Sequence, residues 1–268
     1  MKIGGREFEI GKKVYIMGIL NITPDSFSDG GKFNRQEEAM RQTEKMIREG
    51  ADLIDVGGES TRPGHTPVSE DEEIKRIIPV IQEIKERFDI PVSVDTCKSR
   101  VAKEALDAGA DLLNDIWGFL QDEEMAHLAA SYDVPACLMH NRERADYKNF
   151  IKDVAEDLKK CLAAAEKYGV KKDKIILDPG IGFGKTYEQN LILMNHLEEI
   201  TGLGYPVLLG ASRKSMIGLT LNLPVTEREE GTIAASVIGA VKGCSFVRVH
   251  NVKVNARALK MTEAILHS

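Results

Sequence analysis

Short apolar runs recur along the chain, and most of them end in a polar residue. The first clear run covers residues 14–20, and later runs cover residues 53–56, 92–94, 112–114, 136–139, 175–177, 207–209 and 246–249. Runs this short and rich in Val, Ile and Leu are typical of strands that are buried on both faces. The pattern predicts eight strands. Residues 3–13 before them suggest a short hairpin or an extended segment.

Between these runs, apolar residues return at helical spacing. The plainest stripe lies behind a capping box that begins at Ser69, and a second box that begins at Thr226 predicts a helix of small residues. Both helices are expected to pack on a sheet. The first stripe consists of Ile74, Ile77, Ile78, Ile81 and Ile84, and the second helix carries Ala234, Ala235, Ile238 and Val241.

One strand unit recurs within the sequence. Gly50-Ala-Asp-Leu-Ile-Asp55 returns as Gly109-Ala-Asp-Leu-Leu-Asn114, and more loosely at residues 243–248. In each copy a helix stops at glycine and a buried strand ends in a polar side chain, which is typical of a parallel sheet. Eight such strands in 268 residues favour a single (β/α)8 TIM barrel over an open doubly wound sheet. Without a linker or a composition break, residues 1–268 are predicted to form one domain.

Composition excludes several classes of protein. The 36 basic and 42 acidic residues are interspersed and give a net charge of −6, so the basic footprint of a nucleic-acid-binding protein is absent. The four cysteines are far apart without a C-x-x-C pair, which favours free thiols in a reducing compartment. No signal-peptide pattern and no run near the ~18 apolar residues of a membrane span is found. We therefore expect a soluble, cytoplasmic protein without a nucleic-acid or membrane partner.

Two connections are longer than the roughly 2–6 residues of most βα loops. One runs from Asn21 to about Arg35, and the other runs from Gly57 to about Ser69. At the mouth of a barrel such loops are candidates for lids or substrate-binding segments. The alternative is disorder without function.

Polar residues follow the predicted strands at their carboxyl ends. Because the carboxyl ends of barrel strands meet at one mouth, we expect these side chains to converge, although any single Asp or Asn is equally well explained as a helix cap or turn residue. They are Asn21, Asp55, Asp95, Asn114, His140, Asp178, residues 212–214, Arg248 and His250.

The types of these residues suggest a ligand. Asp95, Asn114 and Asp178 offer acceptors and donors that suit a flat heterocycle with a guanidine-like edge. Lys214, Arg248 and His250 lie on the seventh and eighth strands, the region where barrels frequently bind phosphate. The predicted substrate is a polar ring joined to an anionic group. Metal binding has weaker support, since Asn21 together with phosphate oxygens would suit only a water-rich magnesium ion.

The glycine-rich stretch after the sixth strand resembles a phosphate loop only at first sight. The Walker pattern requires glycine where this chain has Pro179, and the dinucleotide fingerprint requires glycine at Lys185. Asp178 therefore stands out as a strand-end acid beside a tight turn. Lys185 is expected to serve structure or surface charge.

Five motifs together resemble the dihydropteroate synthase family and occur in the family's order. They are Gly18-Ile-Leu-Asn-Ile-Thr-Pro-Asp-Ser-Phe-Ser-Asp-Gly-Gly31, Asp55-Val-Gly-Gly-Glu-Ser-Thr-Arg-Pro-Gly64, Asp178-Pro-Gly-Ile-Gly-Phe-Gly-Lys185, Gly210-Ala-Ser-Arg-Lys-Ser215 and Arg248-Val-His250. The resemblance implies a (β/α)8 enzyme of folate biosynthesis and a target of sulfonamides. It would join 6-hydroxymethyl-7,8-dihydropterin pyrophosphate to 4-aminobenzoate, releasing pyrophosphate and forming 7,8-dihydropteroate, and would be a homodimer.

The resemblance also assigns roles to residues. Asp29, Arg62, Asp95, Asp178 and Lys214 are implied as catalytic, and the metal would be Mg²⁺ at Asn21. Pterin is expected at Asp95, Asn114, Met139, Asp178 and Lys214; pyrophosphate at Asn21, Thr61, Arg62, Arg248 and His250; aminobenzoate at Phe27, Asp29, Phe183, Lys214 and Ser215.

The expected chemistry is a dissociative substitution at carbon, with the arylamine arriving second. Cations around pyrophosphate would stabilise its growing charge, and nearby acids would stabilise positive charge on the pterin methylene. Two alternatives stay open from the sequence. One is a methyltetrahydrofolate–corrinoid methyltransferase with the same acid and amide pocket, and the other is a non-catalytic pterin-binding barrel.

Overall fold

Eight parallel strands form the centre of the molecule. The structure, a computed structural model, describes residues 1–23, 32–59 and 68–268, and residues 32–35 by their backbone only. The strands hydrogen-bond in the order β8-β7-β6-β5-β4-β3-β10-β9, and a parallel bridge between Leu177 and Val207 joins the two ends of this series. They are β3 Tyr15–Asn21, β4 Leu53–Gly57, β5 Val92–Asp95, β6 Leu112–Asp115, β7 Ala136–Met139, β8 Ile175–Asp178, β9 Leu208–Leu209 and β10 Phe246–Val249. The predicted TIM barrel is confirmed.

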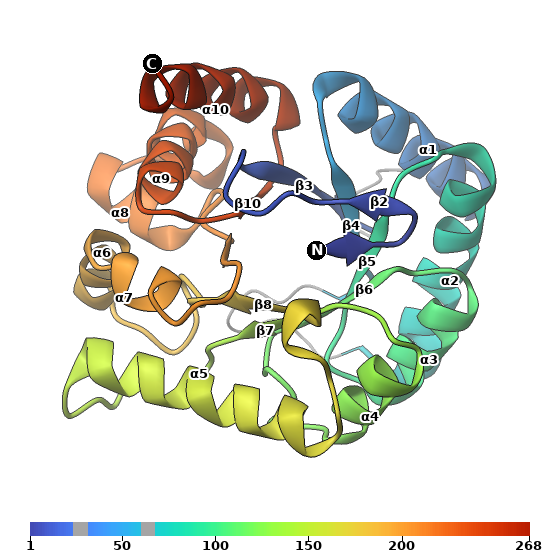
Figure 1. Cartoon of the computed structure of the whole chain (residues 1–268). Helices are drawn as coiled ribbons and strands as arrows, with labels where there is room; N and C mark the ends of the chain where they lie inside the picture. Colours follow the sequence, from blue (N-terminus) through green and yellow to red (C-terminus); the bar gives the residue numbers. More distant parts are fainter. Residues whose placement is uncertain (24–31, 60–67) are drawn as a thin grey trace.

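Helices surround the barrel, as Figure 1 shows in a view along its axis. Most strands are followed by a helix that returns the chain to the start of the next strand, which is the connection that parallel neighbours require. The helices are α1 Lys32–Glu49, α2 Glu70–Arg87, α3 Ser99–Asp107, α4 Glu124–Ser131, α5 Phe150–Lys167, α6 Tyr187–Asn195, α7 Glu198–Thr201, α8 Ser215–Leu221, α9 Glu229–Val241 and α10 Val252–Leu266. None of the helices in these described ranges is long and apolar enough to cross a membrane.

Local sequence signals explain where several helices begin. Ser69 caps α2 by accepting from the backbone N–H of Glu72, which is one half of the predicted capping box. Thr186 and Gln189 form a reciprocal capping box at α6. The box expected at Thr226 is wrong, because Thr226 lies in a 3₁₀ turn at Val225–Glu227 and α9 begins only at Glu229.

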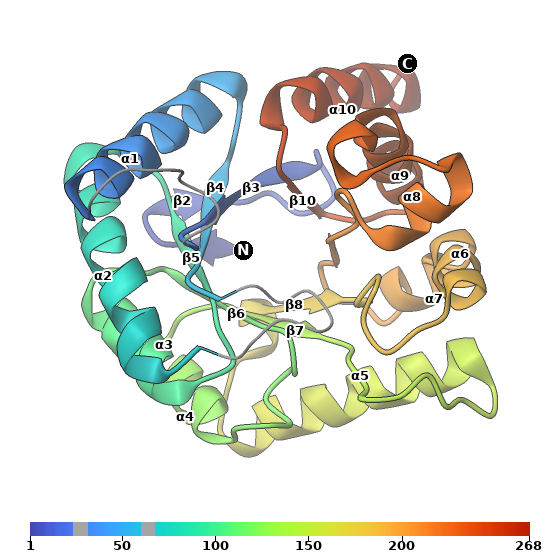
Figure 2. The ribbon, with the colours of Figure 1, turned by 180° about the vertical axis from the view of Figure 1, so that it is seen from behind.

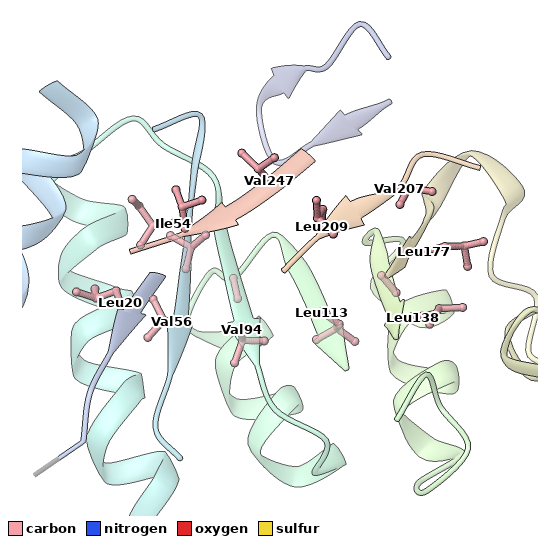
Figure 3. Packing of buried hydrophobic residues seen from close by; sticks show 14 of the residues in the cluster. Leu20, Ile54, Val56, Val94, Leu113, Leu138, Leu177, Val207, Leu209 and Val247 are labelled. Carbon is pink, nitrogen blue, oxygen red and sulfur yellow. The ribbon is translucent and has the colours of Figure 1, made fainter. Parts of the chain in front are cut away.

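The two faces of the strands have different neighbours, because side chains alternate across a strand. Outward-facing residues pack beneath the helices in one large cluster, and Figure 3 shows several of them, including Ile54, Leu138 and Val247, on strands around the barrel. Inward-facing residues form a second cluster with Ile3 and Phe8.

This second cluster fills one end of the barrel. Ile3 belongs to the antiparallel hairpin of β1 Lys2–Ile3 and β2 Arg6–Glu7, which confirms the predicted amino-terminal hairpin. Its apolar side chains pack against Met17, Leu53 and Phe246 near the starts of the strands. The barrel interior is therefore apolar at its amino end, and polar residues occupy the carboxyl end. Figure 2 shows the molecule from behind the view of Figure 1.

Candidate active site

A buried ionic network crosses the barrel above its apolar end. The guanidinium of Arg248 donates to Asp55 through Nε and to Asp95 through Nη2, both at 2.6 Å. Asn114 donates its amide nitrogen to Asp55 at 3.2 Å. Register explains the meeting, since Asp95 and Asn114 are paired on β5 and β6. Four side chains from four strands thus form one polar layer.

One acceptor in this layer has no partner among the described residues. Asp95 Oδ1 is buried without a hydrogen bond, although Asp95 Oδ2 receives Arg248. A buried unsatisfied oxygen is costly unless something else satisfies it. Burial raises the pKa of Asp95 to about 7, against the lowering effect of Arg248. The layer is therefore suited to a ligand that brings an N–H donor.

Asp178 ends β8 next to this layer and is also buried. Its Oδ1 accepts from the backbone N–H of Gly180 at 2.7 Å, and Gly180 has the left-handed φ of +69° that glycine adopts readily. Burial raises the pKa of Asp178 to about 6, while the bond from Gly180 and the charge of Lys214 act in the opposite direction. Asp178 is thus a second carboxyl group whose charge a donor would stabilise.

The turn after Asp178 presents an aromatic ring to a cation. The ammonium of Lys214 lies 3.9 Å from the centroid of the Phe183 ring, within the range of a cation–π interaction. Helix α8 begins directly after Lys214, at Ser215. Phe183, Lys214 and Ser215 therefore border one side of the mouth.

The described residues predicted to bind pyrophosphate lie near the carboxyl ends of β10 and β3, the next strands after β9 in the barrel. His250 follows β10, and its Nδ1 is 2.9 Å from the hydroxyl of Ser212. Asn21 ends β3 opposite Gly57, where an added Cβ would come 3.7 Å from Asn21 Oδ1 and 3.6 Å from Asp95 Oδ2. The missing side chain at Gly57 leaves a space between Asn21 and Asp95.

His140 does not join the polar layer, although it follows a strand as the others do. It continues β7 on the face opposite Met139, and its ring nitrogens lie 3.3 Å from Asp157 and 2.8 Å from the ammonium of Lys185. The expectation that every strand-end residue reaches the mouth is therefore wrong for His140. Lys185 is partly buried and bonded to the turn, so its structural role is confirmed and a surface role is not.

Four of the predicted site residues, Phe27, Asp29, Thr61 and Arg62, lie outside the described residues, as do most residues of the two long connections. The structure brings the other predicted residues to the carboxyl end of the barrel: Asn21, Asp95, Asn114, Met139, Asp178, Phe183, Lys214, Ser215, Arg248 and His250.

Asp55 is the main functional candidate to which sequence reasoning gave no role. It is fully buried and bonds both Arg248 and Asn114. The internal repeat contained a signal, because Asp55 occupies the position that Asn114 holds in the second copy. Two positions equivalent in the repeat therefore meet inside the barrel.

The fold and this polar layer define a class of protein. Residues 17–250 match the family model described as "Pterin binding enzyme". The match includes the residues of the polar layer and all of the barrel strands except the first two residues of β3. The chain belongs to the pterin-binding enzyme family.

Individual relatives narrow this class. The chain is 64% identical over 267 residues to the dihydropteroate synthase of Clostridium beijerinckii, covering 99% of each chain. A dihydropteroate synthase structure from Clostridium difficile in the presence of pteroic acid has a TM-score of 0.95 and 49% identity, covering 98% of this chain and 100% of that one. One from Xanthomonas albilineans with 4-aminobenzoic acid has a TM-score of 0.91 and 40% identity, over 96% and 94%. Within the class, this chain is a member of the dihydropteroate synthase family.

Proposed function

We propose that this chain condenses 6-hydroxymethyl-7,8-dihydropterin pyrophosphate with 4-aminobenzoate to give 7,8-dihydropteroate and pyrophosphate. The observation that carries the proposal is the unsatisfied Asp95 Oδ1 in a buried layer beside a second acid, Asp178. A pterin offers adjacent N–H donors on a flat ring, which this arrangement would satisfy. Relatives named dihydropteroate synthase favour this reaction over the corrinoid methyltransferase and over a non-catalytic barrel.

In this proposal, the pterin ring lies over the polar layer. Asp178 and Asp95 accept its N–H groups. The amide nitrogen of Asn114 is bonded to Asp55, so the Asn114 oxygen is the atom that accepts from the ring. Met139, buried and paired with Asp178 across β7 and β8, provides an apolar contact, and Lys214 donates to the ring.

The pyrophosphate lies toward Asn21, His250 and the outer side of Arg248, with Thr61 and Arg62 as further ligands. The described residues contain no cluster of three or more His, Cys, Asp or Glu that would hold a metal by itself. A magnesium ion would suit Asn21 if this residue provided one oxygen and the pyrophosphate and water provided the others. When bound there, the ion would supply positive charge to the leaving group.

Aminobenzoate lies against the ring of Phe183 and the stem of Lys214, with its carboxylate near Ser215. Phe27 and Asp29 are assigned to the same side. Sulfonamides, which resemble aminobenzoate, would compete there.

The proposed chemistry is dissociative. The bond between the pterin methylene and the pyrophosphate oxygen breaks, and its electron pair leaves with pyrophosphate, whose charge meets Arg248 and His250. Positive charge on the methylene is stabilised at short range by Asp178, Asp95 and Asp29. The aminobenzoate nitrogen then forms the new bond and loses a proton. Productive binding of aminobenzoate before any pterin would contradict this order.

The direct test is pyrophosphate release from the purified protein. With pterin pyrophosphate, Mg²⁺ and 4-aminobenzoate, we expect release that is matched by formation of dihydropteroate. Omitting aminobenzoate should abolish dihydropteroate formation, which separates synthesis from hydrolysis. Absence of release in the complete mixture would overturn the proposed function.

The affinity for the pterin substrate should depend on pH. Burial raises the pKa of Asp178 to about 6 and that of Asp95 to about 7, whereas N–H bonds from a ligand favour the ionised carboxylates. Binding therefore displaces protons, and affinity should weaken as pH falls through these values. Calorimetry between about pH 5 and pH 8, in two buffers of different ionisation heat, measures both effects. A constant Kd without proton release would contradict the assigned contacts.

We also propose that the protein is a homodimer. Helices α9 and α10 pack on each other, yet Ile238, Val241, Met261 and Ile265 leave 44%, 59%, 61% and 61% of their surface exposed. A second copy would bury such side chains. Sedimentation measures the mass directly.

Two further properties, the domain organisation and the cellular location, belong to the same proposal. Residues 1–268 are proposed to act as one pterin-binding domain, with the hairpin contributing Ile3 and Phe8 to the barrel interior. The protein is proposed to be cytoplasmic, which its four free cysteines support.

A further inference from the structure

The ammonium of Lys185 holds the turn that carries Phe183. It donates to the carbonyl of Gly180 at 2.8 Å and to that of Phe183 at 2.9 Å, and it lies 2.8 Å from Nδ1 of His140. The protonated amine of Lys185 has three N–H donors, and here each has one acceptor; burial lowers the pKa of this group to about 7. Lys185 therefore connects two carbonyls of the turn to a residue outside it, His140.

His140 is anchored to helix α5. Because His140 accepts at Nδ1, its own proton is assigned to Nε2, which faces Asp157 at 3.3 Å. Asp157 in turn accepts from Nε of Arg142 and from the ammonium of Lys160, both at 2.6 Å. Lys185 thus connects the turn, through His140, to Asp157 on helix α5.

The remaining backbone groups of the turn are held as well. Gly182 donates its N–H to Oδ1 of Asn190 at 2.6 Å, and the hydroxyl of Tyr147 donates to the carbonyl of Gly184 at 2.8 Å. A Cβ at Gly180 or Gly184 would overlap the backbone of the segment after β7. The turn therefore packs closely on its supports.

We propose that Lys185 is a positioning residue that fixes the Phe183 ring opposite Lys214 and thereby sets the affinity for 4-aminobenzoate, an inference that rests on the proposed function. Lys185 bonds the carbonyl of Phe183 itself. The Phe183 ring faces the Lys214 ammonium at 3.9 Å, a geometry that a shift of the turn would change.

The effect should be larger for the second substrate, because Lys185 bonds the carbonyl of Phe183 directly, whereas it reaches the Asp178 side chain only through Gly180 and through its charge. Asp178 belongs to β8, and its backbone carbonyl accepts from the N–H of His140 at 2.9 Å within the sheet. Phe183 lies outside the sheet and is held through the turn. Loss of the Lys185 ammonium should therefore displace Phe183 and leave the pterin acid Asp178 in place.

Steady-state kinetics of Lys185→Met test this inference. Methionine keeps most of the length and removes all three donors. We expect the KM for 4-aminobenzoate to rise roughly tenfold, with the KM for pterin pyrophosphate within about twofold of the wild type. Lys185→Gln, which keeps two donors on a side chain one bond shorter, should show the same split at smaller size and replaces the Met variant if that variant does not fold.

Thr186→Ala is the matched control. It removes the side-chain cap of α6 one residue further on, so thermal stability should fall while both KM values stay unchanged. A double-mutant cycle gives a second test. If Lys185 acts through Phe183, then Lys185→Met should change the KM for 4-aminobenzoate little in a Phe183→Ala background.

Equal changes in both KM values, no change in either, or effects of the two substitutions that multiply would each overturn the inference. The proposed function is tested separately, because it stands or falls on pyrophosphate release by the wild-type protein.

Discussion

Asp178→Ala is expected to abolish measurable binding of the pterin substrate while the barrel stays folded. The substitution leaves ring N–H donors unpaired in a buried site, at a cost of roughly 1–3 kcal/mol for each lost bond and more for a bond to a charged group. Two such bonds correspond to a loss of about 100-fold or more in affinity. Calorimetry with the pterin substrate measures the change.

The fold should tolerate this substitution for a specific reason. Burial raises the pKa of Asp178 to about 6, so ionised Asp178 is costly to the free protein near neutral pH. Removing it also removes that cost, although the bond from the N–H of Gly180 is lost. Circular dichroism and a thermal melt should therefore show a folded protein.

Asp115→Ala is the matched control. Asp115 ends β6, which is separated from β8 by β7; it is also buried, and burial raises its pKa to about 6 as well. Its two oxygens accept from the backbone N–H groups of Trp117 and Phe119, so it serves its own loop. The control should lose stability and keep pterin affinity. Unchanged affinity in Asp178→Ala would return Asp178 to the same structural role.

The sequence was sufficient to predict the barrel because its signals are local and repeated. Each strand is a short apolar run that ends in a polar residue, and the strands observed, such as β7 at Ala136–Met139 and β10 at Phe246–Val249, agree with the predicted runs. The secondary-structure prediction that failed is the capping box at Thr226, because this residue lies inside a 3₁₀ turn and not at the start of a helix.

The site was less predictable because direction and partners depend on three-dimensional packing. His140 and Met139 are adjacent in sequence, yet alternation along the strand sends His140 to Asp157. Nothing local indicates that Asp55 would meet Arg248, a residue 193 positions later. The orientation of the Lys185 side chain is likewise set by two backbone carbonyls and by the ring of His140, and sequence spacing does not predict that these groups lie near it.

Arg248 was predicted as a pyrophosphate ligand. In the structure it is also the counter-charge of two buried acids, Asp55 and Asp95. Burial acts to lower its pKa, but Asp55 and Asp95 hold that pKa above the ordinary value. The guanidinium thus remains charged between two buried carboxylates. It supports the acids that are proposed to bind pterin, and the pyrophosphate is proposed to meet its outer side.

Arg248→Met should therefore destabilise the protein strongly as well as remove activity. Deleting one partner of a buried ionic network leaves uncompensated charge, at a cost of about 3–5 kcal/mol. The cost should grow as pH rises, because the pKa of Asp95, already raised to about 7, would rise further without the guanidinium. A group whose pKa is raised by folding loses stability as pH rises through that value. Urea denaturation at about pH 5 and pH 8 measures both effects.

Arg100→Met separates burial from charge. Arg100 also pairs with two carboxylates, Glu70 and Asp71, but on the surface, where solvent screens the ion pairs, so its loss should hardly move the urea midpoint. Adding Asp55→Asn to Arg248→Met removes one buried carboxylate that has lost its partner, and should recover part of the stability. If Arg248→Met were as mild as Arg100→Met, Arg248 would not be the counter-charge of the buried acids, and its assigned role would be confined to the anion at the mouth.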